Sequence, residues 1–195
     1  MQDITSSFGG PRYLNLTVLI ITHNYTLFTH HYFHACPNLL ALYISDCMLT
    51  GAETSEELDQ LRQTNIAAQR LHGTWKSLHR FNGSAPMLYA LGLTCPIKRL
   101  EFGYDPEYDA DPRMLRTVIG DARPTHLTVH VPHAYELLDT DLAAVLSEPH
   151  ARQVQSLGLY VSFTLHDLWR GYEAGLVFVS VVASYRRVRQ SERCM

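Results

Sequence analysis

The chain has 195 residues, of which 46% are hydrophobic and 18% are charged. This is enough for one well-buried domain, and the composition excludes a disordered or fibrous protein. The formal net charge is -3 with a pI near 6.4, so we expect no nucleic-acid partner and no membrane partner.

The first residues do not resemble a signal peptide. They carry no cationic segment, and their apolar run is interrupted by Asn15, Thr17 and Thr22. The later apolar run, residues 176–183, is about half the length needed to span a bilayer. We therefore expect an intracellular protein, cytoplasmic or nuclear, in which free thiols are the default state of Cys36, Cys47, Cys95 and Cys194.

A leucine-rich pattern, LxxLxLxx followed by Asn or Cys, recurs along the chain. The two complete copies consist of Leu16, Leu19, Ile21 and Asn24, and of Leu39, Leu42, Ile44 and Cys47. Copies without the closing residue follow at residues 97–102, 124–129 and 154–159. Each copy predicts a short strand.

Helical segments are predicted between these copies, and most have recognisable ends. Thr54 and Glu57 form a capping box, and Gly73 can end this helix in a left-handed conformation. Its predicted apolar stripe consists of Leu58, Leu61, Ala68 and Leu71.

Three further helices follow. Ser84 and Pro86 begin one that continues through Leu91. Asp111 and Pro112 begin the next, which Gly120 is expected to end; its apolar face consists of Met114, Leu115, Val118 and Ile119. Asp139 or Asp141 begins the last, through Leu146.

This alternation predicts an α/β fold, either a doubly wound sheet or a solenoid. Strands such as residues 98–102 and 125–131 place a polar group at every second position, so one sheet face should be exposed, which favours the solenoid. We predict a leucine-rich-repeat-like solenoid of about six irregular repeats, with a curved parallel sheet and convex helices. Residues 1–195 form a single domain, with repeats best defined over 14–163 and an atypical C-terminal segment at 164–195.

One part of the chain also resembles a known family. Residues 72–109 read HGTWKSLHRFNGSAPMLYALGLTCPIKRLEFGYDPEYD, and RPTHLTVHV and VQSLGLYVSF follow. They resemble the leucine-rich-repeat region of fungal, especially basidiomycete, F-box-like proteins. The resemblance implies a non-enzymatic scaffold, the substrate-binding repeat region of an F-box ubiquitin-ligase receptor. The F-box itself has no counterpart in these residues, so a Skp-type adaptor is expected only if an F-box exists upstream.

In a solenoid the leucines point inward, and the residues between them line the concave sheet. We expect a protein or peptide substrate to bind there, with Tyr and Arg contributing most of the energy. The predicted partner-binding residues are Ile20, Tyr43, Ser45, Arg99, Glu101, His126, Thr128, His130 and Tyr160.

A histidine cluster supports a different hypothesis. His30, His31 and His34 lie close together, with Cys36 nearby. A zinc site needs three or four converging ligands, and no second metal-binding motif follows, so we expect neither metal nor cofactor. We predict a helix over this cluster, in which His30 and His34 share one face; it directs Leu27, Phe28, Tyr32 and Ala35 to the core, with His31 at the edge and with His30 and His34 pointing away.

No catalytic motif is present, and the acidic stretch at residues 105–111 lacks the central glycine and final glutamate of a calcium loop. Two alternatives remain open. The chain could be a small α/β enzyme or metal-binding protein that uses these histidines, or a truncated product without independent function.

Overall fold

The strands form one sheet in which their spatial order is their order in the sequence. A computed structural model describes residues 10–22, 28–45, 55–103, 112–131, 142–161 and 179–184. The strands in these residues are β1 (Val18–Thr22), β2 (Ala41–Ser45), β3 (Leu78–Ser84), β4 (Ile97–Gly103), β5 (His126–Val131), β6 (Ser156–Val161) and β7 (Val179–Ser184). Neighbours from β1 to β6 pair in parallel, and β7 pairs antiparallel with β6.

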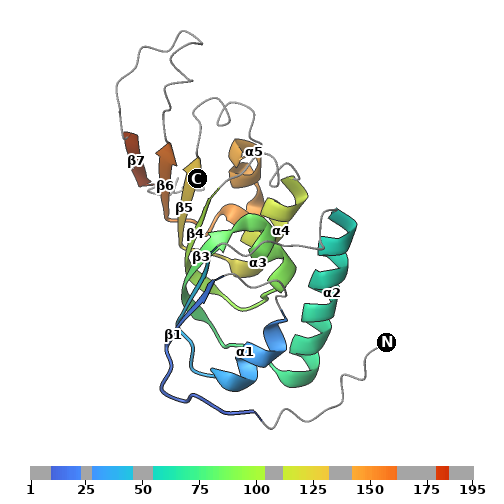
Figure 1. Cartoon of the computed structure of the whole chain (residues 1–195). Helices are drawn as coiled ribbons and strands as arrows, with labels where there is room; N and C mark the ends of the chain where they lie inside the picture. The colour runs from blue at the N-terminus through green and yellow to red at the C-terminus, as the bar shows by residue number, and fades with distance from the viewer. Residues whose placement is uncertain are drawn as a thin grey trace, which may run out of the picture.

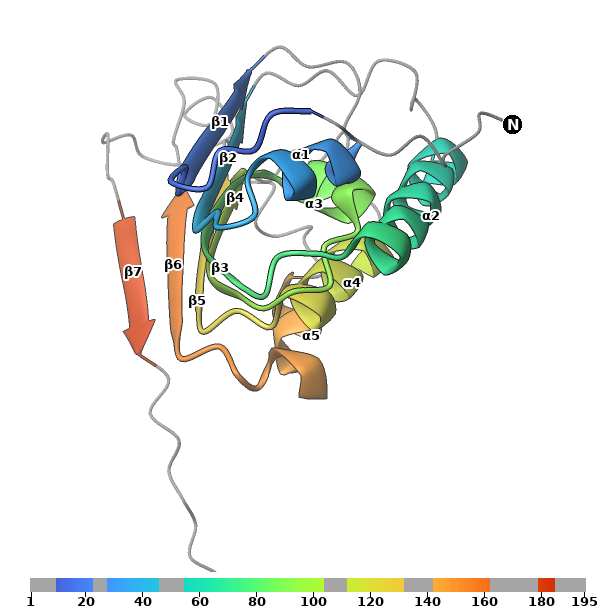
Figure 2. The same cartoon turned by 90° about the horizontal axis from the view of Figure 1, so that it is seen from below.

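The helices lie together on one side of this sheet (Figures 1 and 2). They are α1 (Thr29–Ala35), α2 (Ser55–His72), α3 (Ala85–Leu91), α4 (Pro112–Ala122), α5 (Leu142–Ser147) and the 3-10 helix η2 (Pro149–Ala151). Crossovers between parallel strands share one handedness, so a sheet that grows in one direction receives its helices on one face. The predicted α/β class with a parallel sheet is confirmed, and no described helix covers the other face, which we call the open face.

The leucine-rich positions form the core between sheet and helices, as predicted. Leu42 and Ile44 of β2, and Leu100 and Phe102 of β4, are buried. They pack with helix side chains such as Leu88 in one hydrophobic cluster. Each such side chain contributes about 1.5 to 3 kcal/mol relative to an exposed one.

Strand β3 was not among the predicted strands. Its leucine-rich positions are Leu78, Phe81 and Gly83. Phe81 and Gly83 lie opposite Leu100 and Phe102 of the neighbouring strand β4. A Cβ on Gly83 would lie 2.9 Å from Cζ of Phe81 and 3.3 Å from the carbonyl oxygen of Ile44. The Phe81 ring therefore occupies the space that a side chain at position 83 would fill. Because position 83 is a glycine, the leucine-rich pattern lacks one apolar residue here and is not recognised in the sequence.

Helix α2 differs from its predicted apolar stripe. Leu58 and Ala68 are buried, but Leu71 is 72% exposed. In its place the buried face carries the polar residues Arg62, Asn65 and Gln69.

These polar side chains bind the carbonyl groups at the end of α3. Nη1 of Arg62 donates to the oxygen of Tyr89 at 2.9 Å, and Nδ2 of Asn65 donates to that of Ala90 at 2.8 Å. Nε2 of Gln69 donates to the oxygens of Leu91 and Gly92 at 3.1 and 2.9 Å. The last carbonyls of a helix have no hydrogen-bond donor within the helix, so side chains of α2 supply donors to the carbonyls at the end of α3.

The helix ends agree with the sequence in part. Gly73 adopts the predicted positive φ of 88°, and Oγ of Ser84 accepts from the N–H of Met87 as the predicted N-cap of α3. Helix α4 does not stop at Gly120: it continues to Ala122, and Arg123 takes the left-handed conformation with φ 49°. The other predicted caps, Thr54, Asp111, Asp139 and Asp141, lie outside the described residues.

The predicted orientation of α1 is correct in part: Tyr32 and Ala35 pack against the hydrophobic core, as expected, but they are not its most buried side chains. Phe33 and Thr29 are its buried residues, not Tyr32 or Ala35, which are only partly buried; the ring of Phe33 meets Trp75 edge-on at 4.5 Å between centroids. His31 is exposed and His30 is partly buried, the reverse of the prediction. The turn that follows contains Cys36, which is a free, buried thiol like Cys95. Leu27, Cys47 and Cys194 lie outside the described residues.

Candidate functional site

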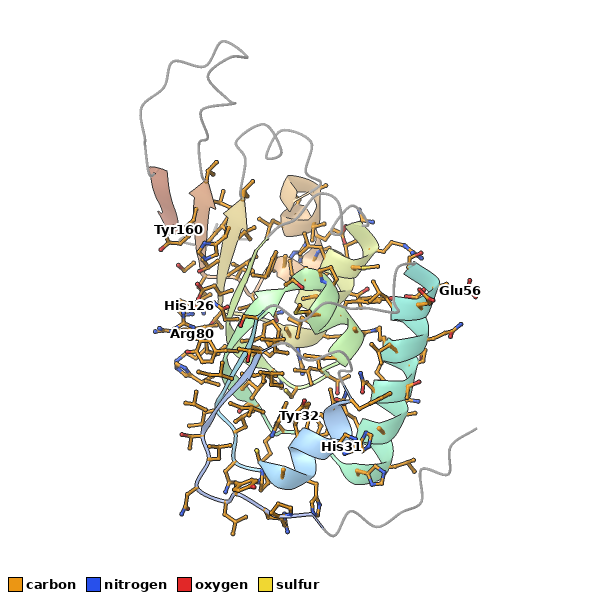
Figure 3. The ribbon with its side chains drawn as sticks, in the orientation of Figure 1. His31, Tyr32, Glu56, Arg80, His126 and Tyr160 are labelled. Carbon is orange, nitrogen blue, oxygen red and sulfur yellow. The ribbon has the colours of Figure 1, made fainter. Side chains whose placement is uncertain are left out.

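The open face carries all the predicted partner-binding residues. Side chains alternate along a strand, so those between the buried core positions point away from the helices. Ile20 comes from β1, Tyr43 and Ser45 from β2, Arg99 and Glu101 from β4, His126, Thr128 and His130 from β5, and Tyr160 from β6. Figure 3 shows His126 and Tyr160 on this side, together with Arg80 of β3.

Strand pairing aligns these residues in rows across the sheet. The first row consists of Val18, Ala41, Arg80, Arg99, His126 and Ser156. The second consists of Ile20, Tyr43, Asn82, Glu101, Thr128 and Gly158. Adjacent members of a row are about 4.8 Å apart at the backbone.

Five open-face side chains, one from each of β2 to β6, form a contact chain. The guanidinium carbon of Arg80 lies 5.4 Å from the ring centroid of Tyr43, and Nη2 of Arg80 donates to Oε2 of Glu101 at 2.5 Å. Nε2 of His130 lies 3.1 Å from Oε1 of Glu101, and the ring of His130 stacks on Tyr160 with centroids 4.8 Å apart. We call these residues the open-face chain: Tyr43, Arg80, Glu101, His130 and Tyr160.

Arg80 and Asn82 were not among the predicted open-face residues, because β3 was not among the predicted strands. The signal that could have found them is the spacing from Leu78 to Phe81, which repeats that of Ile97 to Leu100.

Glu101 is the carboxylate at the centre of the open-face chain. Burial raises the pKa of Glu101, but the hydrogen bonds from Arg80, His130 and Asn82 together lower it by more than burial raises it. The pKa of Glu101 therefore lies below the ordinary value. The same hydrogen bond with Glu101 raises the pKa of Arg80. The charges of Arg80 and Glu101 therefore neutralise each other at neutral pH.

Arg99 has no such partner. It is exposed, and no acidic side chain in the described part of the chain forms an ion pair with it. Its neighbours in the row are Arg80 and His126.

His126 is oriented by the residue before it. Oγ1 of Thr125 donates to the carbonyl of Lys98 at 3.1 Å and lies 2.9 Å from Nδ1 of His126. Within the described residues, Nε2 of His126 has no hydrogen-bond partner.

The two ends of the open face are less polar. Val18 and Ile20 on β1 are 47% and 65% exposed, and Tyr160 on β6 is 46% exposed. The face thus has an apolar end, a charged centre and an aromatic side chain near β7.

The histidines of α1 lie close to one another and to His72 of α2. The rings of His30 and His31 lie 3.9 Å apart, and those of His30 and His72 lie 6.1 Å apart. Burial lowers the pKa of His30, and His31 and His72 lower it further. Within the described residues, no group of three or more His, Cys, Asp or Glu side chains could hold a metal ion. The acidic stretch at 105–111 lies outside the described residues.

Comparison with protein-family models, with curated proteins and with solved structures finds no match to this chain. None of the helices in the described ranges is long and apolar enough to cross a membrane. The contacts among the side chains of the open face are the basis for the function proposed below.

Proposed function

We propose that the chain is a leucine-rich-repeat-like solenoid in which each strand and the helix after it form one irregular repeat. The sequential order of β1 to β6, the helices on one side, and the buried leucine positions in matching register support this. Repeat proteins of this kind present a broad surface built from equivalent positions of successive units.

The proposed function is recognition of a protein or peptide on the open face, without catalysis. The observation that carries it is the open-face chain, which links side chains of five neighbouring strands. Side chains already held in place lose little conformational entropy on binding. Tyrosine and arginine, which this chain provides, are the residues that most often dominate binding energy at interfaces.

The resemblance to fungal F-box-like proteins suggests a biological setting for this scaffold. Residues 72–109, on which the resemblance mainly depends, include β3, α3 and β4 and thus the centre of the open face. We propose that the scaffold corresponds to the substrate-binding part of an F-box ubiquitin-ligase receptor. Binding of a Skp-type adaptor would require an F-box upstream of these repeats.

Quantitative affinity capture with matched variants tests the recognition function. Tyr43→Ala and Arg99→Ala remove side chains from the open face, whereas Arg70→Ala removes an exposed arginine from α2 on the other side. We expect both open-face variants to lose a partner that wild type and Arg70→Ala retain, with unchanged circular dichroism. Retention of every captured protein by both open-face variants, or unfolding of either variant, would contradict the assignment of the site.

A further inference from the structure

The open face carries charge of the opposite sign to the whole chain. The chain has a formal net charge of -3. On the open face of β1 to β6, Glu101 is the one acidic residue, and Arg80 neutralises it. Among the described residues Arg99 has no acidic partner, and Lys98 is exposed next to it in the chain. A local positive patch on an acidic protein favours an acidic partner.

The surroundings of Arg99 suit a carboxylate. Arg80 and His126 flank it in the same row, on strands whose backbones lie about 4.8 Å away on either side. A guanidinium binds a carboxylate through two parallel N–H donors. Arg99 therefore offers a bidentate donor pair to one carboxyl group.

The same row leads from Arg99 to an apolar end. It continues through Arg80 and Ala41 to Val18, and exposed Ile20 lies two residues further along β1. The small side chain of Ala41 leaves room for a chain to cross β2. The step from β4 to β1 is three strand spacings, or about 14 Å.

We propose that the open face binds an extended acidic segment of a partner protein that crosses the strands. One Asp or Glu carboxylate of the segment lies on Arg99 between Arg80 and His126, and an aliphatic side chain covers Val18 and Ile20. An extended chain advances about 3.4 Å per residue, so these two residues lie about four positions apart. The proposal rests on the proposed recognition function and specifies its ligand.

The size of the face favours a segment over a globular partner. The seven strands of the sheet, with three outward positions each, cover about 29 by 14 Å, or roughly 400 Å². A standard protein interface buries about 800 Å² on each partner. Nucleic acid fits less well, because it needs several cations for successive phosphates, and the described part of the face offers one arginine without an acidic partner.

Selection from a display library of random 12-residue peptides on the purified full chain tests the proposal. We expect enriched peptides to carry Asp or Glu with an aliphatic residue about four positions away. Enrichment of basic or uncharged peptides, or of acidic peptides with no preferred spacing, would overturn it.

A synthetic pair of labelled peptides then tests the carboxylate site by fluorescence anisotropy. Both peptides carry one leucine and, four positions away, either glutamate or lysine. Arg99→Glu should weaken binding of the glutamate peptide about 10-fold or more, as expected for loss of a charge-assisted hydrogen bond. It should also strengthen binding of the lysine peptide. Arg70→Glu on α2, the matched control, should change neither affinity.

The outcomes separate this proposal from the broader function. If selected peptides lose binding with Tyr43→Ala but are not acidic, the open face is a recognition site and the acidic ligand is wrong. If no selected peptide depends on Tyr43 or Arg99, both proposals fail. Oligouridine RNA that binds more tightly than the acidic peptide, and is released by Arg99→Glu, would replace the peptide as occupant.

Discussion

Substitution of two inward-facing residues of β3 tests the register of this strand in the sheet. Phe81 is fully buried and pairs in register with Leu42 and Leu100, while Gly83 pairs with Phe102. The Phe81 ring fills the space above Gly83. Phe81→Leu combined with Gly83→Val would give β3 the side chains that β5 carries at the same register.

Each single change should destabilise the chain. Phe81→Leu leaves a cavity at a fully buried site, which costs about 1 to 2 kcal/mol. Gly83→Val drives a side chain into Phe81 and towards the carbonyl of Ile44, and such overpacking costs about 1 to 3 kcal/mol. In the double variant the valine fills the space that the smaller leucine leaves. We therefore expect the pair to cost about 1 kcal/mol, with a coupling energy near -2 kcal/mol.

Urea denaturation of wild type, both single variants and the double variant measures this coupling. The slope of unfolding free energy against urea should be the same in all four proteins, so that shifts in the midpoint report stability. Costs that add in the double variant would mean that Phe81 and Gly83 do not share one space. The register of β3, and with it the placement of Arg80 on the open face, would then be wrong.

Three further predictions concern the polar groups. Asn65→Ala leaves the N–H of Thr29 and the carbonyl of Ala90 without their partner, so it should cost about 3 kcal/mol in urea denaturation, whereas Gln63→Ala on the exposed side of the same helix should cost little. The folded pKa of Glu101 lies below the ordinary value of 4.5, so its stabilising contribution is present above that pH and is lost as pH falls through the folded pKa. Glu101→Gln should flatten the acid loss of stability below about pH 4.5, and an unchanged profile would contradict the contact chain. The folded pKa of His30 lies below 6.5, so the unfolded state takes up a proton first and stability falls as pH drops from 6.5 to the folded pKa. His30→Gln should reduce that fall, which thermal unfolding between about pH 7 and about pH 5 would measure.

The sequence was informative where apolar side chains repeat at fixed spacing. The copies at Leu39, Leu42 and Ile44, and at Ile97, Leu100 and Phe102, are buried as predicted, because a strand that packs on helices needs an apolar residue at each of these positions. Alternation then placed the residues between them on the open face. Burial and alternation are local properties, so a single sequence contains them.

Helix α2 shows where this kind of pattern fails. Its buried face is polar because its partners are carbonyl groups of α3, separated by more than twenty residues in the chain. Asn65 in addition accepts from Thr29 of α1, and Arg62 pairs with Asp121 of α4. A hydrophobic pattern contains no record of such partners, so Leu71 was expected in the core and Asn65 was not.

Strand β3, which was not predicted, also changes the spacing of the ligand that the open face can recognise. Without β3, the strand of Tyr43 would lie directly beside that of Arg99, and only two strand spacings, about 10 Å, would separate Arg99 from Val18. An extended ligand would then place its acidic and aliphatic residues about three positions apart. With β3 inserted, Arg80 lies between Tyr43 and Glu101 and contacts both, and the distance grows to about four positions. The spacing in selected peptides is thus a measurement of how many strands the ligand crosses, and it tests the order of the sheet and the proposed ligand together.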